Sequence, residues 1–111
     1  MSYEILTVEE FRRDIKKLHK KYRSIKKDIL DLIQRLEDDA YIGIDLGNSL
    51  YEIRVRNSDI GGKSGGYRVI YYTRLSRNRI YLLAMYAKSQ KETIDTKQLA
   101  PILKRLQNSD K

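Results

Sequence analysis

Apolar residues in the first part of the chain recur in steps of three and four, which is the spacing of one face of a helix. A first stripe predicts a helix that begins near Val8, where Thr7 to Glu10 have the T-x-x-E spacing of a capping box. A second stripe predicts another helix, capped by Ser24 and ending at the acidic cluster 37–39. The stripes are Val8, Phe11, Ile15, Leu18 and Tyr22, then Ile25, Ile29, Leu32, Ile33 and Leu36. With a short strand at 3–6 before them, these segments predict an N-terminal helical hairpin.

The spacing changes to a period of two after Gly43 and Gly47, which is typical of strands. Tyr51, Ile53 and Val55 alternate with Glu52, Arg54 and Arg56, and this predicts a half-buried strand with a charged face. Two longer runs, 67–73 and 79–86, are almost continuously apolar and are joined by a polar turn at 76–78. They predict a central hairpin buried on both faces.

A final helix is expected from Asp95 or Thr96, with Leu99, Ile102, Leu103 and Leu106 on its apolar face. Pro101 falls in its first turns, where proline is tolerated best. The predicted order is β-α-α-β-β-β-α, without an internal repeat. We therefore expect one α+β domain over residues 1–111, with a mainly antiparallel four-stranded sheet, an N-terminal helical hairpin and a C-terminal helix.

Composition restricts the chemistry that such a domain can perform. The chain has no cysteine and one histidine, which excludes disulfides and most zinc or histidine-based schemes, so neither a metal nor a cofactor is expected. Catalysis would have to come from Arg, Lys, Tyr, Asp, Glu, Ser or Thr. The N-terminus does not have the pattern of a signal peptide, and no stretch approaches the roughly 20 apolar residues of a membrane span. We expect a cytoplasmic protein without a membrane partner.

The net charge of +8 is unevenly distributed along the chain. Residues 12–27 hold nine basic residues, residues 28–52 hold seven acidic ones against Arg35 alone, and residues 53–91 hold nine basic ones again. A basic surface on a small protein suggests a polyanion such as RNA. For 12–27 a solvated, lysine-rich helix explains the charge as well as RNA does. For 53–91 the RNA interpretation leads, because the charges fall in strands and are mostly arginine.

Two features of the strand region suggest an anion site. The loop from Asn57 to Gly66 contains four glycines and Lys63, so its backbone amides could approach a phosphate, although a flexible hairpin connection explains the glycines equally well. It is not a Walker loop, because Gly62-Lys63-Ser64 does not open a helix. Arg68 stands in an apolar strand, where an unpaired guanidinium is costly. Either Arg68 has a structural carboxylate partner, or it faces a cleft that receives an anion.

Three segments together resemble RelE/ParE-superfamily toxins, and most closely the HigB-like branch, which carries a G-G-x-R-V/I-I-Y-Y strand. They are residues 51–56 (Tyr-Glu-Ile-Arg-Val-Arg), 65–72 (Gly-Gly-Tyr-Arg-Val-Ile-Tyr-Tyr) and 81–88 (Tyr-Leu-Leu-Ala-Met-Tyr-Ala-Lys). The resemblance covers residues 50–94, and the flanking helices agree in order. It implies a RelE-like fold and the toxin of a type II toxin–antitoxin pair, an endonuclease that cleaves mRNA in the A site of the 30S ribosomal subunit. Its implied partners are mRNA, the ribosome and a cognate antitoxin, with DNA reached only through the antitoxin.

The resemblance also suggests site residues. The basic strand positions of the family fall on Glu52, Arg54 and Arg56, so the first is lost here. The strand arginine of the family matches Arg68, and the basic residue after the last strand matches Lys88. The position of the RelE tyrosine falls on Ile94, which leaves the general base unassigned.

RNA supplies its own nucleophile, the 2′-OH, so the residues need only align it, move protons and stabilise charge, without a metal. Arg68 would stabilise the phosphorane with Arg54 as a second clamp, Lys88 would protonate the leaving oxygen or stabilise charge, and Tyr86 would stack a base or relay a proton. Core packing is the competing explanation for Tyr86. Three residues would hold RNA without taking part in the chemistry: Arg56, Lys63 and Lys91. The alternatives are a ParE-like gyrase poison, a non-catalytic RNA-binding module, and a structural protein whose strand arginines are paired internally.

Overall fold

The computed structural model describes residues 3–61, 65–90 and 94–109, and they form a five-stranded sheet with helices on both faces. The strands lie in the order β1-β5-β4-β3-β2, and only β1 and β5 are parallel. Their bounds are β1 Glu4–Thr7, β2 Ile44–Gly47, β3 Leu50–Val55, β4 Tyr67–Arg74 and β5 Arg79–Ala87. The α+β class, the helical hairpin and the central β4–β5 hairpin predicted from the sequence are confirmed.

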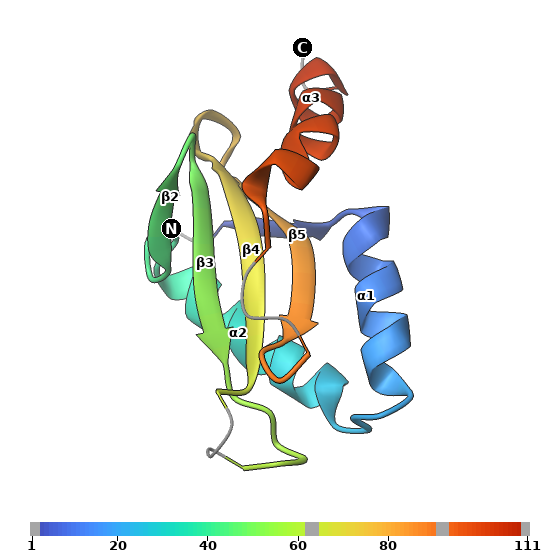
Figure 1. Ribbon diagram of the computed structural model, residues 1–111. Helices are drawn as coiled ribbons and strands as arrows, with labels where there is room; N and C mark the ends of the chain where they lie inside the picture. The colour runs from blue at the N-terminus through green and yellow to red at the C-terminus, as the bar shows by residue number, and fades with distance from the viewer. Residues whose placement is uncertain (1–2, 62–64, 91–93, 110–111) are drawn as a thin grey trace.

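Helices α1 (Glu9–His19) and α2 (Ile25–Asp38) belong to one side of the sheet, and Figure 1 shows α2 crossing behind β3 and β4. The Tyr22 ring, between the two helices, meets Tyr67 of β4 edge to face at 5.6 Å. The chain after β5 runs in front of the sheet and forms the short 3-10 helix η2 (Thr96–Leu99) and α3 (Ala100–Ser109) (Figure 1). Leu99, Ile102 and Leu106 are buried there, as the sequence predicts. No helix in the described segments has the length and apolar character that crossing a bilayer requires.

The prediction of four strands was wrong, because β2 was missed. All four residues of β2 are exposed, so its sequence carries no alternation between buried and solvated positions. Strand β2 pairs with β3 only from Leu50 to Glu52, and the outer edge of β3 beyond Glu52 is therefore left without a strand neighbour. Arg54, one of the predicted site residues, lies on this uncovered part.

The start of α1 also differs from the prediction. Val8 is the N-cap and makes no side-chain capping bond, so the predicted capping box does not form. The Thr7 hydroxyl instead accepts a hydrogen bond from the Arg12 guanidinium at 2.9 Å. Ser24 is the N-cap of α2 as predicted, but its side chain does not cap, and its backbone N–H donates to Asp59 at 2.9 Å.

Two aspartates, the half-buried Asp14 and the buried Asp28, tie the helices to the strand ends that carry the predicted site residues. The Asp14 carboxylate of α1 accepts the Met85 N–H at 3.0 Å, beyond the point where β1 stops pairing with β5. The Asp28 carboxylate of α2 accepts the Ser58 N–H at 3.0 Å and the Ser58 hydroxyl. Because Asp28 is only 2% exposed, these bonds hold the segment after β3 firmly against α2.

Candidate nucleic-acid interface

Three of the predicted site residues form a row across the centre of the sheet. Arg54 of β3 is directly opposite Arg68 of β4, which is directly opposite Tyr86 of β5. Directly paired residues project from the same face with Cβ atoms about 5 Å apart. Since Tyr67, the neighbour of Arg68, packs against Tyr22 on the helical side, the row belongs to the opposite face. The sheet thus places two guanidinium groups side by side, which is unfavourable unless negative charge lies between them.

Glu52 supplies that negative charge. It lies two residues before Arg54, on the same face, and its carboxylate forms an ion pair with the Arg68 guanidinium. The side chains are 16% exposed for Arg68 and 11% for Glu52, so the pair is largely shielded but not sealed from solvent. Arg68 therefore has a carboxylate partner, which is one of the two explanations that the sequence left open for it. The Arg68 Nε is buried and has no hydrogen-bond partner among the described residues, which leaves one donor unused.

Tyr86 completes the network by donating its hydroxyl to the other Glu52 carboxylate oxygen at 3.3 Å. Burial raises the pKa of Tyr86, and the charge and hydrogen bond of Glu52 raise it further. The positive charge of Arg68 and a backbone hydrogen bond from Ile94 act against this rise in the Tyr86 pKa. Tyr86 is thus a protonated donor near neutral pH and not a base. Ile94, the position where the resemblance would place a tyrosine, contributes backbone to this hydroxyl.

Lys88 lies just after β5, next to the turn that opens β4. Its N–H donates to the Gly66 carbonyl at 3.0 Å. Gly65 has a φ of +75°, and a Cβ there would lie 2.6 Å from the Lys88 Cδ, so the lysine side chain passes over this glycine. Gly66 has a φ of +62°, and a Cβ there would come within 2.3 Å of the Val55 carbonyl oxygen. The glycine pair is therefore required for close packing, and it holds the Lys88 side chain over the entry to β4.

A hollow of about 330 Å³ opens on this network, and we call it the Arg68 hollow. It is lined by Arg35, Ile42, Gly43, Ile44, Glu52, Ile53, Arg54 and Arg68. Among these residues, Glu52 is the one carboxylate beside three arginines. The Arg35 guanidinium reaches over from α2 and donates to the Arg54 carbonyl at 3.3 Å, at the uncovered edge of β3.

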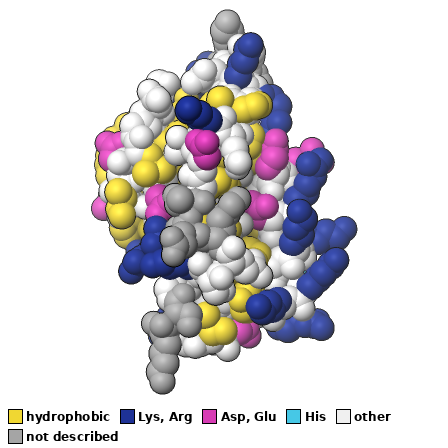
Figure 2. Space-filling model, in the orientation of Figure 1, with side chains coloured by type: hydrophobic (Ala, Val, Ile, Leu, Met, Phe, Trp, Pro, Cys, Tyr) yellow, Lys and Arg dark blue, Asp and Glu magenta, His cyan; other side chains and the backbone are white. Residues whose placement is uncertain are grey.

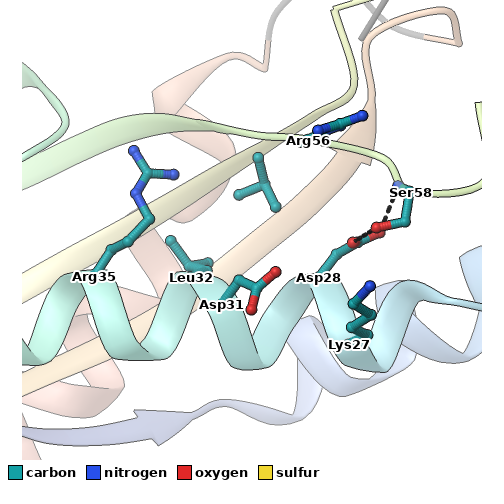
Figure 3. Close-up of a pocket in the computed structure, with 8 residues that line it drawn as sticks. Lys27, Asp28, Asp31, Leu32, Arg35, Arg56 and Ser58 are labelled. Carbon is teal, nitrogen blue, oxygen red and sulfur yellow. Dashed lines mark hydrogen bonds between the residues drawn. The ribbon is translucent and has the colours of Figure 1, made fainter. Parts of the chain in front are cut away.

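Arg35 was missed by the sequence reasoning, which counted it only as the exception in an acidic segment. The signal available in the sequence was this isolation, since Arg35 is the one basic residue among seven acidic ones in 28–52. In the structure it forms no ion pair with the described residues. The other predicted residues are divided in space. Arg54 and Arg68 line the Arg68 hollow, while Tyr86 lies on the neighbouring strand β5 and Lys88 just after it. Arg56 lies at a separate groove of about 470 Å³ beside α2 (Figure 3). Lys63 and Lys91 lie outside the described residues.

The basic side chains also form separate groups on the surface. Figure 2 shows lysine and arginine side chains along the α1 side of the molecule, and a separate basic group beside the lower half of β3. Within the described segments no group of three or more His, Asp or Glu side chains is arranged to hold a metal ion. The row carries guanidinium and phenol groups, and its neighbours Glu52 and Lys88 add a carboxylate and an ammonium group.

Comparisons with known proteins agree on one family. The family model described as the RelE toxin of the RelE/RelB toxin–antitoxin system matches residues 10–109. No curated protein sequence matches the chain significantly. Among solved structures, a mutant of E. coli toxin RelE in the free state superposes with a TM-score of 0.58 at 16% identity, covering 83% of this chain and 90% of that one.

Two complexes superpose as well. The archaeal RelE–RelB complex from Pyrococcus horikoshii matches with a TM-score of 0.53 at 20% identity, over 79% of this chain and 97% of that one. The mutant E. coli RelE with a peptide of its antitoxin matches with a TM-score of 0.52 at 14% identity, over 93% of this chain and 95% of that one. At these identities the superpositions establish the fold.

Proposed function

The chain belongs to the RelE toxin family, and from this premise we propose that it is the toxin of a type II toxin–antitoxin pair and a ribosome-dependent endoribonuclease. It would cleave mRNA in the ribosomal A site through the 2′-OH of the RNA, without a metal ion. The strand motif at 65–72 supports placing it in the HigB-like branch. Its partners would be mRNA, the 30S subunit and a cognate antitoxin in the cytoplasm, with DNA contacted only through the antitoxin.

The observation that carries this proposal is the Arg54–Arg68 pair beside Glu52 in the Arg68 hollow. Two guanidinium groups lie opposite one another across β3 and β4, and the one carboxylate beside them, Glu52, is ion-paired with Arg68. A phosphodiester that enters the hollow would supply the second negative charge. Arginine is suited to this position because its planar fork binds phosphate oxygens bidentately and remains ionised.

The proposed mechanism begins at Glu52, which the family comparison alone did not identify as a base. Once a phosphate has taken over Arg68, the freed carboxylate can accept the proton of the 2′-OH. The 2′-oxygen attacks phosphorus, the bond to the 5′-oxygen breaks, and a 2′,3′-cyclic phosphate remains. Arg68 and Arg54 would stabilise the negative charge that develops on the phosphate oxygens in this step.

The leaving 5′-oxygen needs a proton, and the ammonium group of Lys88 would supply it. Tyr86, held protonated by burial and by Glu52, would donate a hydrogen bond to Glu52 or to a phosphate oxygen. This role fits a chain that has Ile94 where a tyrosine is expected, because the base is then a carboxylate. Arg56, Lys63 and Lys91 would hold the RNA outside the reacting centre.

One observation favours a second candidate function. Arg68 is already paired with Glu52, as a purely structural protein or a non-catalytic RNA-binding module would require. A ParE-like gyrase poison would share the fold, but no contact within the described residues favours it over the endoribonuclease. Cleavage of RNA separates the proposed endoribonuclease from all of these alternatives.

The test is primer extension on translated mRNA after induction of the wild-type chain and of the Arg68→Ala variant. We expect new 3′ ends within translated mRNA for the wild type, none for the variant, and relief of growth arrest when the antitoxin is co-expressed. Unimpaired growth and intact mRNA with the wild type expressed alone would contradict the proposal.

A further inference from the structure

We propose that the groove between α2 and the end of β3 is a second RNA-backbone site, which continues from the Arg68 hollow and binds phosphates away from the reacting one. We call it the α2–β3 groove. It has a volume of about 470 Å³ and is lined by Lys27, Asp28, Asp31, Leu32, Arg35, Val55, Arg56 and Ser58 (Figure 3). The inference rests on the proposed function, because it extends the surface on which the substrate would lie.

The first argument is continuity between the two sites. Arg35 lines both the Arg68 hollow and the α2–β3 groove, so the two sites meet at its side chain. Arg54 belongs to the hollow and lies on the uncovered edge of β3, and Arg56, two residues later and just after the strand, belongs to the groove. A strand of RNA held by Arg68 and Arg54 would therefore pass Arg35 where it rounds the uncovered edge of β3 to reach the groove.

The second argument is the arrangement of the groove. Lys27, Asp31 and Arg35 follow one another at four-residue steps, so they lie on one face of α2, and Figure 3 shows Arg56 across from them. Lys27 and Arg35 are separated by about 12 Å along the helix axis. This span is long enough for more than one phosphate of an RNA strand to contact the groove.

The third argument is the balance of charge. Lys27, Arg35 and Arg56 are exposed and form no ion pair with any described residue. The Asp28 carboxylate is buried and accepts both hydrogen bonds of Ser58, so each of its oxygens already has a hydrogen-bond partner. Asp31 is the one exposed carboxylate among the lining residues, and it opposes anion binding. Three cations against two aspartates leave the lining with a net positive charge, which attracts a polyanion.

The lining side chains also indicate which part of RNA would bind. No aromatic side chain lines the groove, so it offers no surface on which a base could stack. Its lysine, arginine and serine side chains are of the types that contact phosphates, and its apolar side chains are Leu32 and Val55. Binding should therefore depend on salt and be indifferent to sequence. The RNA could be the substrate strand or ribosomal RNA, which share this backbone chemistry.

The experiment measures affinity and its salt dependence by fluorescence anisotropy, with a single-stranded 2′-O-methyl oligoribonucleotide that lacks the nucleophile. The loss variant is Lys27→Gln with Arg56→Gln, and its matched control is Lys16→Gln with Lys20→Gln on the exposed face of α1. Each lost phosphate contact lowers the slope of log K against log salt by about 0.7 for single strands, so the loss variant should lower it by about 1.4. The control pair should leave the slope unchanged.

A variant expected to bind RNA more tightly is included because misfolding can lower RNA affinity but does not raise it. Asp31→Asn should raise RNA affinity several-fold, whereas Asp38→Asn, an equal charge change at the end of α2, should not. A second arm measures binding to vacant ribosomes. Changes with the oligonucleotide assign the groove to the substrate strand, and changes with ribosomes alone assign it to ribosomal RNA.

Both of those results support an RNA-backbone site. If the wild type binds and cuts RNA but the loss and gain variants behave like their controls in both arms, the inference fails and the proposed function stands. The inference also fails if the loss variant alters only the affinity for the antitoxin, because the groove is then a protein contact. If the wild type neither binds nor cuts RNA, the proposed function and the inference fail together.

Discussion

The Glu52 carboxylate of β3 is shared between the Arg68 guanidinium of β4 and the Tyr86 hydroxyl of β5, so one acidic side chain joins the three central strands on the face where the chemistry is proposed. A phosphate that binds Arg68 must compete with this carboxylate. Glu52 therefore has two proposed roles: it neutralises Arg68 in the free protein, and it accepts a proton when RNA is bound.

Replacement of Glu52 by glutamine separates these roles. Glu52→Gln removes the charge that competes with phosphate, so RNA should bind more tightly, while the loss of the base should slow cleavage by about 100- to 10,000-fold. Anisotropy with the 2′-O-methyl strand and single-turnover cleavage on ribosomes measure the two effects. Asp38→Asn is the control of equal charge. Wild-type cleavage by Glu52→Gln would remove Glu52 from the chemistry.

The entry to β4 should depend on Gly66 more than on another glycine of positive φ. Gly66→Ala would place a Cβ 2.3 Å from the Val55 carbonyl oxygen as well as straining the backbone, whereas nothing lies within 4 Å of a Cβ at Gly61. We expect Gly61→Ala to cost about 1 kcal/mol of unfolding free energy, and Gly66→Ala to cost distinctly more. Urea denaturation measures both, and equal losses would show that the Val55 contact is unimportant.

The tie between Asp28 and Ser58 should be a major contributor to stability. Asp28→Ala leaves the Ser58 N–H without its carboxylate and opens space beneath the groove, which should cost about 1–3 kcal/mol of unfolding free energy. Asp31→Ala, on the exposed face of the same helix, should change it by less than about 0.5 kcal/mol. Thermal and urea melts of the two variants make the comparison. Equal stability of the two would mean that the tie is not structural.

Tyr86 should influence alkaline stability but not the pH dependence of cleavage near neutrality. Its pKa is raised in the folded protein, so its contribution to stability is complete below the unfolded value of about 10 and is lost as pH rises toward the folded value. Wild type should therefore lose more stability than Tyr86→Phe between about pH 9 and pH 11. The cleavage rates of both proteins should have profiles of the same form from about pH 6 to pH 8. An inflection that disappears in Tyr86→Phe would identify the tyrosine as the base.

The sequence predicted much of the fold because most elements bury one regular face. The helices and β3 show their own period, the β4–β5 hairpin shows as two nearly continuous apolar runs, and the flanking glycines mark the entry to β4. Strand β2 could not be predicted, since its residues are exposed and its pairing is fixed only by β3. The predicted capping box failed because Arg12 occupies the Thr7 hydroxyl, a contact that spacing alone does not reveal.

The candidate site was predictable only in part, because the register between neighbouring strands decides which of its residues lie side by side. The alternation in 51–56 places Glu52 and Arg54 on one face, but only the β3–β4 pairing puts Arg68 opposite Arg54 and within reach of Glu52. Arg35 comes from a helix about twenty positions earlier in the chain, and its place beside β3 follows from how α2 crosses the sheet. These contacts depend on the tertiary structure, so the sequence identified Arg68 and Arg54 but did not identify Glu52 and Arg35 as members of the site.

The central claim is that Arg68 stabilises the transition state, and the most direct test is the single-turnover rate of ribosome-bound mRNA cleavage by Arg68→Ala, measured together with its thermal melting. The account predicts a rate lower by about 100- to 1,000-fold, little recovery in Arg68→Lys, and a protein that remains folded in both cases. A structural ion pair would instead give an unfolded or strongly destabilised alanine variant. An Arg68→Ala protein that melts like the wild type and cleaves mRNA at the wild-type rate would contradict the account.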